Sequence, residues 1–550
     1  MNFEHSAEGP TFKRCALLSA LLVVIAALRI VSTYTVLSHT VDEPIHLGAG
    51  MEYLDHGTLT GDVSHPPMAR VLSALGPWLA GEHWHHTGNT TTDGTTVLGD
   101  DAHYDRMLAL ARLGILPLFL LACVIVFLWG NHTAGPLAAL FATFLFTTLP
   151  PVLAHAGIVT TDMAATAFTA AGAYAGLLWA ERPAWRRTAV LGLTVGLGML
   201  AKYSLLVFLP AIFGAMYLCR WRGISAIPAQ IREHWRQALT AAALACLVIW
   251  AGFGFSWGQV NFAQISLPAP RFFDGLNDVR IHNTDGHASY ILGKQLHFGV
   301  WYFFPVTLAV KTPLAMLVLL VASLWLVWRQ PRSQKPLAYA RGSDQSRDRK
   351  GASLTALYAP LAYAAVILAI GMSSRINIGV RHILPIYVGL AILAGAGAAA
   401  MLRNRNFLIP LFLLFGWQVV SGAMAHPDYL SYTNEITRGK PENFVAESDL
   451  DWGQDMHLVG DFLKRAGATE VSFTPYNVTY LESGHAFPKT TRSNWFHAAP
   501  GWNVVSLGGW KVYNHPGWTG IRPPQFRIGR SHWAWYFKPG DVPSVPGGDK

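Results

Sequence analysis

Charged side chains are scarce in this chain. They make up 13% of its 550 residues, which is about half of their usual share in soluble globular proteins. Apolar residues make up 52% of the chain, and the mean hydropathy is +0.29. This composition excludes a soluble enzyme and an intrinsically disordered protein, and it predicts an integral membrane protein.

Cysteine is also rare. The four cysteines, Cys15, Cys123, Cys219 and Cys246, all fall in or beside apolar segments. Their positions exclude a disulfide-stapled secreted domain and a cysteine-based metal site. The sequence also lacks a glycine-rich phosphate-binding fingerprint, which argues against a nucleotide-sugar site.

Long apolar runs are abundant, and they predict an all-α polytopic protein with about eleven transmembrane helices. Two of the spans are short, so we expect tilted helices that turn near Lys202, Tyr203 and Ser204. The predicted spans lie near residues 13–37, 107–129, 134–151, 160–180, 188–203, 204–219, 238–257, 299–328, 353–372, 383–402 and 406–425.

The 41 basic residues outnumber the 32 acidic ones and give a net charge of +9. They gather in short loops between alternate spans, which is the positive-inside pattern of a membrane protein rather than a nucleic-acid-binding surface. We therefore expect a multi-pass protein of the plasma (inner) membrane, with a cytoplasmic N-terminus, an extracytoplasmic C-terminus, membrane lipids as neighbours and no nucleic-acid partner.

These boundaries divide the chain into a transmembrane domain, residues 1–426, and a small α+β extracytoplasmic domain, residues 427–550. The transmembrane domain has a large first outer loop at 38–106, a second at 258–298 and a cytoplasmic linker at 329–352. In the first loop, we expect a surface helix over Met68–Ala80 and a polar loop over Gly81–Asp101. In the tail, the pattern predicts a helix over Gln454–Arg465 and strands over Glu470–Thr474, Asn503–Leu507 and Trp533–Phe537.

Three acids stand at the outer ends of predicted spans. Asp42 and Glu43 follow the first span, where carboxylates suit general-base catalysis or binding of a divalent cation; the alternative is a hydrated loop. If the chain is extended there, the two side chains point to opposite sides. Asp162 opens the fourth span, where it fits a helix cap, a catalytic acid or both.

Cations also lie within or beside the apolar spans. Arg29, Arg112, Lys202 and Lys311 fall inside spans, while Arg381 and His382 mark the outer end of the tenth. A cation in hydrocarbon needs a counter-charge or a cavity, and basic groups at this depth suit a lipid phosphate. Internal pairing with the acids and snorkelling of Arg29 or Arg112 are the alternatives.

The order of these pieces resembles the GT-C membrane glycosyltransferases, over about residues 16–425. The nearest branch is that of the protein O-mannosyltransferases, and the lipid A aminoarabinose transferases are more distant relatives. The pieces are Asp42-Glu43, His65-Pro66-Pro67, Thr161-Asp162, Lys202-Tyr203-Ser204 and Arg381-His382-Ile383-Leu384-Pro385. The resemblance to bacterial relatives also includes residues 286–293, which contain His287, and residues 448–455.

The resemblance implies transfer of a sugar from a polyprenyl-phosphate donor to an acceptor hydroxyl outside the cytoplasm, with inversion. By position, it makes Asp42 the base, Glu43 its neighbour and Asp162 the second acid of the site. It makes His65, Lys202 and Arg381 candidates for substrate binding. Lys311 is a further candidate because it is a cation within a span, and His382 and His287 are candidates because they lie in the shared pieces. A divalent metal cofactor stays open, with Asp42 and Glu43 as its candidate ligands, and the acceptor is a protein, a lipid or a glycan.

Two other classes of function fit parts of this pattern. A secondary transporter also buries charges among broken helices, and a non-catalytic lipid-binding or scaffold protein would keep the basic groups. A shared outward cavity for Asp42 and Asp162 distinguishes an enzyme from both.

The topology makes a direct prediction. A reporter that is active only outside the cytoplasm, fused after Lys550, should be active, because an odd number of spans separates the two termini. The same reporter fused before Lys13 should be silent. Activity at the N-terminal fusion alone would invert the topology and place Asp42 on the cytoplasmic side.

Overall fold

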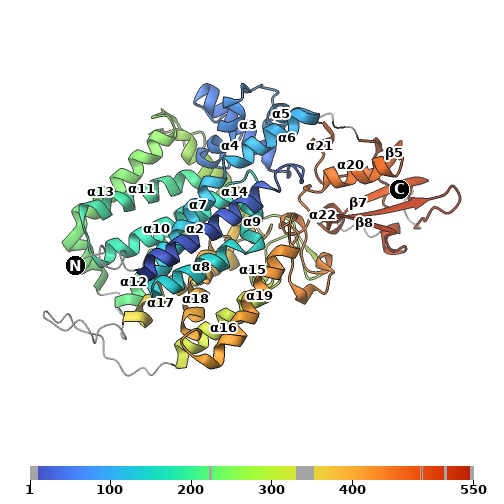
Figure 1. The fold of residues 1–550 in the computed structure, drawn as a ribbon. Helices are drawn as coiled ribbons and strands as arrows, with labels where there is room; N and C mark the ends of the chain where they lie inside the picture. The colour runs from blue at the N-terminus through green and yellow to red at the C-terminus, as the bar shows by residue number, and fades with distance from the viewer. Residues whose placement is uncertain are drawn as a thin grey trace.

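The computed structural model describes residues 10–221, 226–329, 352–482, 485, 487–512 and 517–545. The predicted insert within the linker 329–352 lies almost wholly outside the described residues. Helices form an elongated bundle on one side of the molecule, and a small sheet stands at the opposite side (Figure 1). The molecule is thus a helical body with a compact, mixed C-terminal part.

Five described helical segments are long and apolar enough to cross a membrane, and two bent pairs raise this to as many as seven. The bent pairs turn by 67° and 111°. The five are α2 (Pro10–Val31), α6 (Asp101–Leu113) with α7 (Leu116–Ala134), α10 (Asp162–Glu181), the part of α13 (Ala226–Gly252) from Arg232, and α19 (Leu408–Met424) with the preceding turn η2 (Arg405–Phe407); the pairs are α8 (Pro136–Thr147) with α9 (Pro150–Ala156), and α15 (Phe303–Lys311) with α16 (Leu314–Arg329).

The remaining predicted spans also coincide with helices. Three of these helices are apolar but shorter, namely α12 (Leu205–Trp221), α17 (Ala352–Ser373) and α18 (Ile386–Met401), whereas α11 (Trp185–Ala201) falls in neither group. The turn predicted near Lys202 is present between α11 and α12. The chain is a multi-pass membrane protein, and the count of eleven spans stays a prediction.

Proline explains both bends. Pro150 begins α9 and Pro313 precedes α16; a proline has no N–H to continue a helix and disfavours helical geometry in the residue before it. The bends bring His155 and Lys311, at the ends of α9 and α15, into the protein interior.

Helix α10 lies at the centre of the bundle, because alanine, glycine and threonine cover most of its surface and let its neighbours approach closely. Helix α18 is packed in the same way: a Cβ atom on Gly395 would lie 2.6 Å from the backbone nitrogen of Ala142 in α8. This close packing fixes the N-terminus of α10, where Asp162 lies.

The first outer loop is more helical than predicted. The helix expected over 68–80 is α4 (Pro67–Leu79), but the segment 81–101 is not a plain loop, since it contains α5 (Thr90–Leu98). The Asn89 side chain caps α5 by accepting hydrogen bonds from the Thr91 and Thr92 nitrogens, and Asp93 lies in its first turn. Helix α3 (Glu43–His56) begins directly after Asp42, so the chain there is not extended.

In the second outer loop, α14 (Pro270–Asp285) lies between two short hairpins. Strand β1 (Trp257–Gln259) pairs with β2 (Ser266–Pro268), and β3 (Ser289–Ile291) pairs with β4 (Lys294–Leu296).

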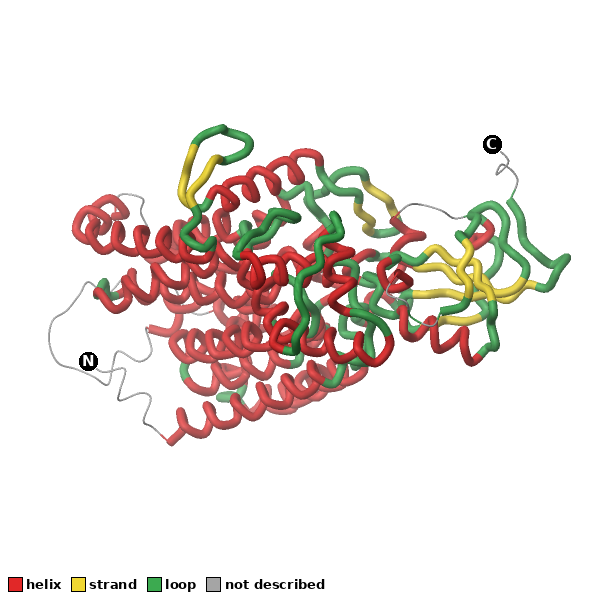
Figure 2. Tube along the Cα trace, turned by 90° about the horizontal axis from the view of Figure 1, so that it is seen from above, coloured by secondary structure: helices red, strands yellow, loops and turns green. Residues whose placement is uncertain are grey.

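The tail forms a five-stranded sheet of order β6-β5-β7-β9-β8 (Figure 2). Strand β5 runs parallel to β6 and β7, whereas β9 runs antiparallel to β7 and β8. The predicted helix and three strands are present as α20 (Met456–Arg465), β5 (Glu470–Thr474), β7 (Gly501–Ser506) and β9 (His532–Phe537); the other elements are β6 (Lys489–Thr491), β8 (Phe526–Ile528), α21 (Thr479–Glu482), α22 (Leu507–Val512) and η6 (Trp518–Gly520).

The first part of the tail, residues 428–455, contacts both the helical body and the sheet: Asp451 accepts from Ser506 and Gly508, and Asp455 accepts from Ser531. It contains three short turns, η3 (Glu435–Thr437), η4 (Pro441–Asn443) and η5 (Glu447–Asp449). Lys311 Nζ donates hydrogen bonds to the carbonyls of Leu430 (2.5 Å) and Asp449 (2.7 Å). The Asp449 carboxylate accepts from the backbone nitrogen of Val380 in η1 (Val380–Ile383), at 3.1 Å.

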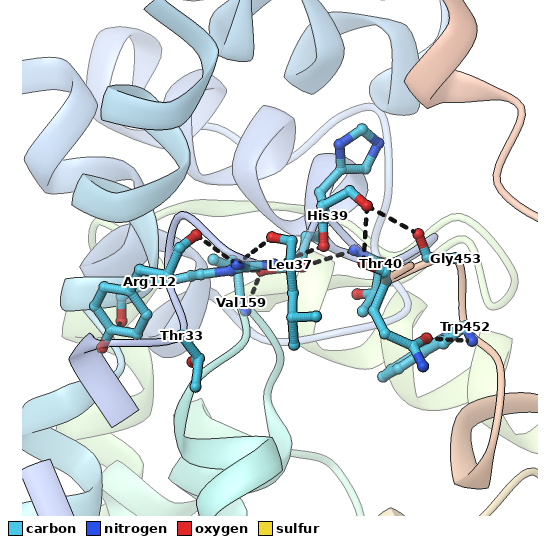
Figure 3. Close-up of polar contacts among 12 residues, drawn as sticks. Thr33, Leu37, His39, Thr40, Arg112, Val159, Trp452 and Gly453 are labelled. Carbon is cyan, nitrogen blue, oxygen red and sulfur yellow. Dashed lines mark hydrogen bonds and ion pairs between the residues drawn. The ribbon is translucent and has the colours of Figure 1, made fainter. Parts of the chain in front are cut away.

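A buried ion pair organises the start of the first outer loop (Figure 3). Arg112 Nε and Nη2 donate to the two Glu43 oxygens, each at 2.9 Å. Both side chains are 1% exposed. The remaining guanidinium N–H groups donate to the carbonyls of Tyr34, Leu37 and Ser38, so all five arginine donors are used.

Glu43 completes the arrangement from the other side. Its oxygens also accept from the backbone nitrogens of Thr40 (2.7 Å) and Val159 (2.9 Å). Burial acts to raise the pKa of Glu43, but Arg112 and these hydrogen bonds hold it below its usual value. The pair therefore joins α6, the segment that follows α2, the start of α3 and the turn before α10.

Removing one partner should be costly. We expect Arg112→Met to lower the free energy of unfolding by about 3–5 kcal/mol, because Glu43 would remain buried without its counter-charge. Thermal unfolding in detergent measures this. Arg106→Met, an exposed arginine on the same helix, is the matched control, and the double variant Arg112→Met with Glu43→Leu should regain part of the loss. An unchanged melting temperature for Arg112→Met would contradict the assigned role.

Candidate active site

The first pair of the site is Asp42 with Arg381. Arg381 Nη1 donates to Asp42 Oδ2 at 2.8 Å, and its guanidinium lies 4.1 Å from the centre of the Trp452 ring. The Asp42 side chain keeps 27% of its surface exposed, whereas Arg381 keeps 11%. Asp42 is thus a carboxylate that is both paired with a cation and open to a second molecule.

The second pair is Asp162 with Lys202, at 2.6 Å between Oδ1 and Nζ. Asp162 lies in the first turn of α10, where the helix dipole favours a negative charge. Its Oδ2 is buried and has no hydrogen-bond partner among the described residues, and the same holds for His155 Nδ1, 4.0 Å away. Lys202 remains 15% exposed.

The two pairs belong to one electrostatic cluster, since Arg381 lies within range of the charges of both Asp42 and Asp162. Local contacts explain how four distant segments meet. The bond from the Val159 nitrogen to Glu43 joins the turn before Asp162 to the residue after Asp42. The bond from Val380 to Asp449 holds the turn that carries Arg381.

Buried histidines surround these charges. The His46 and His65 rings meet edge to face, 4.9 Å apart. Burial lowers the pKa of His46 to about 4, and it lowers the pKa values of His65 and His382 well below their usual range. These rings are neutral at physiological pH, so they supply hydrogen bonds rather than charge.

Glu447 of η5 and His287 of the second outer loop lie near the Asp42–Arg381 pair. The His287 Nδ1 atom is 4.0 Å from Glu447 Oε1. Burial raises the pKa of Glu447 to about 8, although Arg381 opposes the shift. Glu447 is therefore a neutral carboxyl group at pH 7, close to the Asp42–Arg381 ion pair.

Two predicted site residues, Glu43 and Lys311, are bound to internal partners and do not face the site. Glu43 has both oxygens engaged in the buried pair with Arg112, which leaves none for a substrate or a cation. Lys311 is 1% exposed and binds two backbone carbonyls of the tail, so it fixes the tail rather than facing a phosphate. Both corrections have one cause: a charged side chain buried in apolar surroundings takes the nearest internal partner.

The structure gathers the other predicted residues, Asp42, Asp162, His65, Lys202, Arg381, His382 and His287, around one centre. Sequence reasoning missed His46, His155, Trp452 and Glu447. The only signal for Trp452 and Glu447 was their place in or next to the motif at 448–455. Among the described residues, no group of three or more His, Cys, Asp or Glu side chains is arranged to hold a metal ion.

The arrangement combines an accessible carboxylate, two cations and neutral hydrogen-bonding rings. An accessible carboxylate can accept a proton from a hydroxyl. Paired cations in a dry site can stabilise a phosphate oxyanion.

The chain is similar to known proteins in sequence and in fold. The model of the family described as dolichyl-phosphate-mannose-protein mannosyltransferase matches residues 19–264. The fold is similar to that of ArnT from Cupriavidus metallidurans bound to undecaprenyl phosphate, with 12% identity and a TM-score of 0.50 over 94% of this chain and 97% of that chain. These two matches confirm the resemblance that the motifs indicate.

Two further structures are less similar. The oligosaccharyltransferase of Archaeoglobus fulgidus shows 13% identity and a TM-score of 0.43, over 87% of this chain and 65% of that chain. The Pmt1-Pmt2 complex of S. cerevisiae shows 19% identity and a TM-score of 0.35, over 44% of this chain and 33% of that chain. None of the curated proteins compared with this chain matches it.

Glu447 gives the site a pH dependence. Its pKa in the folded protein lies above its ordinary value, so the stability that its neutral form contributes is present at low pH and is lost as pH rises toward about 8. We expect Glu447→Gln to remove this loss, as seen in melting temperatures measured from about pH 5 to pH 9. Glu470→Gln, at an exposed position, should follow the wild type. Parallel profiles for wild type and Glu447→Gln would contradict the assignment.

Proposed function

We propose that this protein is a membrane glycosyltransferase that moves one sugar from a polyprenyl-phosphate donor to an acceptor hydroxyl on the outer side of the membrane. The observation that carries the proposal is the accessible Asp42 carboxylate bound to Arg381. Asp42, His65, Asp162 and Lys202 all lie within the stretch that matches the mannosyltransferase family model. The donor sugar is a hexose or a pentose, and the acceptor is a protein, a lipid or a glycan.

In the proposed reaction, Asp42 takes the proton of the acceptor hydroxyl as the acceptor oxygen bonds to the anomeric carbon. The bond from that carbon to the phosphate oxygen breaks, and its electron pair leaves with the polyprenyl phosphate. Attack from the face opposite the phosphate inverts the anomeric carbon. The acceptor gains the sugar, and Asp42 releases its proton to solvent.

Lys202 and Arg381 are the groups proposed to hold the donor phosphate. In the resting protein each is neutralised by an acid, Asp162 or Asp42. A phosphate at Arg381 would compete with Asp42 for the guanidinium, so donor binding would free the carboxylate oxygen that Arg381 now holds for the acceptor hydroxyl. This coupling favours proton removal only when a donor is present.

His65 and His382 are proposed to bind the sugar hydroxyls, since neutral rings can both donate and accept hydrogen bonds. His287 lies at the edge of the site and is proposed to contact the acceptor. Asp162 is proposed to orient Lys202. A divalent cation remains compatible with the exposed oxygen of Asp42, but Glu43 is not available as its second ligand.

The proposal places the protein in the plasma (inner) membrane, with the N-terminus in the cytoplasm and the tail outside. The clustering of Asp42 and Asp162 favours an enzyme over a scaffold, since a scaffold gains nothing from two acids at one centre.

We expect Asp42→Asn to lower turnover by about 10² to 10⁴ while donor binding changes little, since the amide keeps the shape and loses the basicity. Lys202→Met should instead weaken donor use by roughly ten- to a hundredfold at limiting donor. The assay follows release of polyprenyl phosphate in membranes supplied with a panel of polyprenyl-phosphate hexoses and pentoses and with protein, lipid and glycan acceptors.

Asp285→Asn, at an exposed position in the second outer loop, is the matched control and should keep full activity. Near-normal turnover by Asp42→Asn at equal protein level would remove Asp42 as the base. Absence of release with every donor in the panel would overturn the proposed function.

A further inference from the structure

A cavity of about 410 Å³ lies where the tail meets the last membrane helix. One wall is the C-terminal end of α19, a second is the segment 431–441 and a third is the turn between β8 and β9. We call it the α19 pocket. None of its lining residues belongs to the site around Asp42.

Three buried polar atoms line the α19 pocket without a hydrogen bond to a described residue. They are Ser421 Oγ, Tyr432 Oη and His532 Nε2, and the Ser421 and Tyr432 hydroxyls lie close enough to interact with each other. The other His532 ring nitrogen is already bonded to Ser531 Oγ at 2.8 Å. Because an unsatisfied buried polar group is costly, three in one cavity indicate a ligand that brings hydroxyl groups to it.

The mouth of the pocket is basic. Arg530 donates to the Met424 carbonyl at 2.8 Å and forms no ion pair with a described residue. Arg527 is 54% exposed and lies 3.8 Å from Glu442. The acid that lines the pocket, Glu435, accepts a hydrogen bond from Trp417. Arg530 therefore offers its charge to an incoming anion.

An apolar stripe leads along α19 to this mouth. Ile409, Leu413, Trp417, Val420 and Met424 recur every three or four residues, which places them on one face of the helix. All five are exposed in the protein. Because α19 is long and apolar enough to cross a membrane, this face lies against lipid and ends at the pocket.

We propose that the α19 pocket binds a phospholipid of the phosphatidylglycerol type, that is, an anionic lipid whose headgroup ends in hydroxyls. Arg530, with Arg527 beside it, binds the phosphate. The headgroup hydroxyls reach Ser421, Tyr432 and His532, and an acyl chain lies along the stripe from Met424 to Ile409. The lipid thereby joins the β8–β9 turn to the membrane helix. This site is independent of the proposed sugar transfer.

Native mass spectrometry of the full-length protein tests this, with phosphatidylglycerol, phosphatidic acid and phosphatidylethanolamine offered in equal amounts. Each charge-assisted contact changes affinity by roughly tenfold or more. We expect the wild type to retain phosphatidylglycerol at least about tenfold better than phosphatidylethanolamine, and better than phosphatidic acid, which lacks the terminal hydroxyls.

Two variants separate the contacts. Arg530→Gln should weaken both anionic lipids, whereas Tyr432→Phe with Ser421→Ala should reduce phosphatidylglycerol to the level of phosphatidic acid. Arg522→Gln and Tyr536→Phe, at exposed positions outside the pocket, are the matched controls and should bind as the wild type does. Size-exclusion profiles establish that each variant is folded.

Equal retention of the three lipids by the wild type would overturn the proposal, because that comparison needs no variant. Unchanged retention in folded Arg530→Gln would also overturn it, since the lipid would then be bound elsewhere. Displacement of phosphatidylglycerol by an equal amount of polyprenyl phosphate would assign the pocket to the donor instead.

Discussion

The buried pair of Arg112 and Glu43 is the constraint on which the outer face of this protein depends. A guanidinium with five donors satisfies three carbonyls in the segment that follows α2 and both oxygens of Glu43, while Glu43 binds the turn that precedes α10. Both side chains are buried in the protein and shielded from water, so a partial arrangement would leave unpaired charges and carbonyls. The geometry is therefore nearly all-or-none. The pair also fixes the positions of Asp42 and Asp162, since each lies next to a segment that is bonded to Arg112 or Glu43.

The resting site is balanced in charge. Asp42 and Asp162 are matched by Arg381 and Lys202, and the surrounding histidines and Glu447 are neutral at pH 7. Balance is what a poorly hydrated cavity requires. An anionic ligand therefore does not bind at a site that already carries net positive charge; it must displace the Asp42 and Asp162 carboxylates from Arg381 and Lys202. This displacement is selective, because only a ligand with its own negative charge can replace the carboxylates as counter-ions of the two cations.

The sequence was sufficient to predict the helical elements, because apolar runs of membrane length leave few alternatives. It also indicated most of the residues around Asp42, because charged groups at the outer ends of spans need polar or charged neighbours. It was not sufficient to predict which charged side chains pair with each other. Glu43 and Lys311 looked as available as Asp42 and Lys202, and only the fold shows that they are consumed by Arg112 and by tail carbonyls. Helix α5 was missed because most of its nine residues are polar and its start depends on the Asn89 cap. Glu447 was missed because its environment, rather than its identity, makes it unusual.

The contacts of residues 428–455 have a consequence for how the protein is made. Arg381 is held through Val380 by Asp449, and Trp452 lies against its guanidinium while its carbonyl accepts the Val41 nitrogen beside Asp42. A ribosome that has synthesised every membrane helix has not yet supplied these residues. The cluster around Asp42 and Arg381 is consequently incomplete until the last quarter of the chain emerges, and a prematurely terminated product that inserts correctly would still lack it.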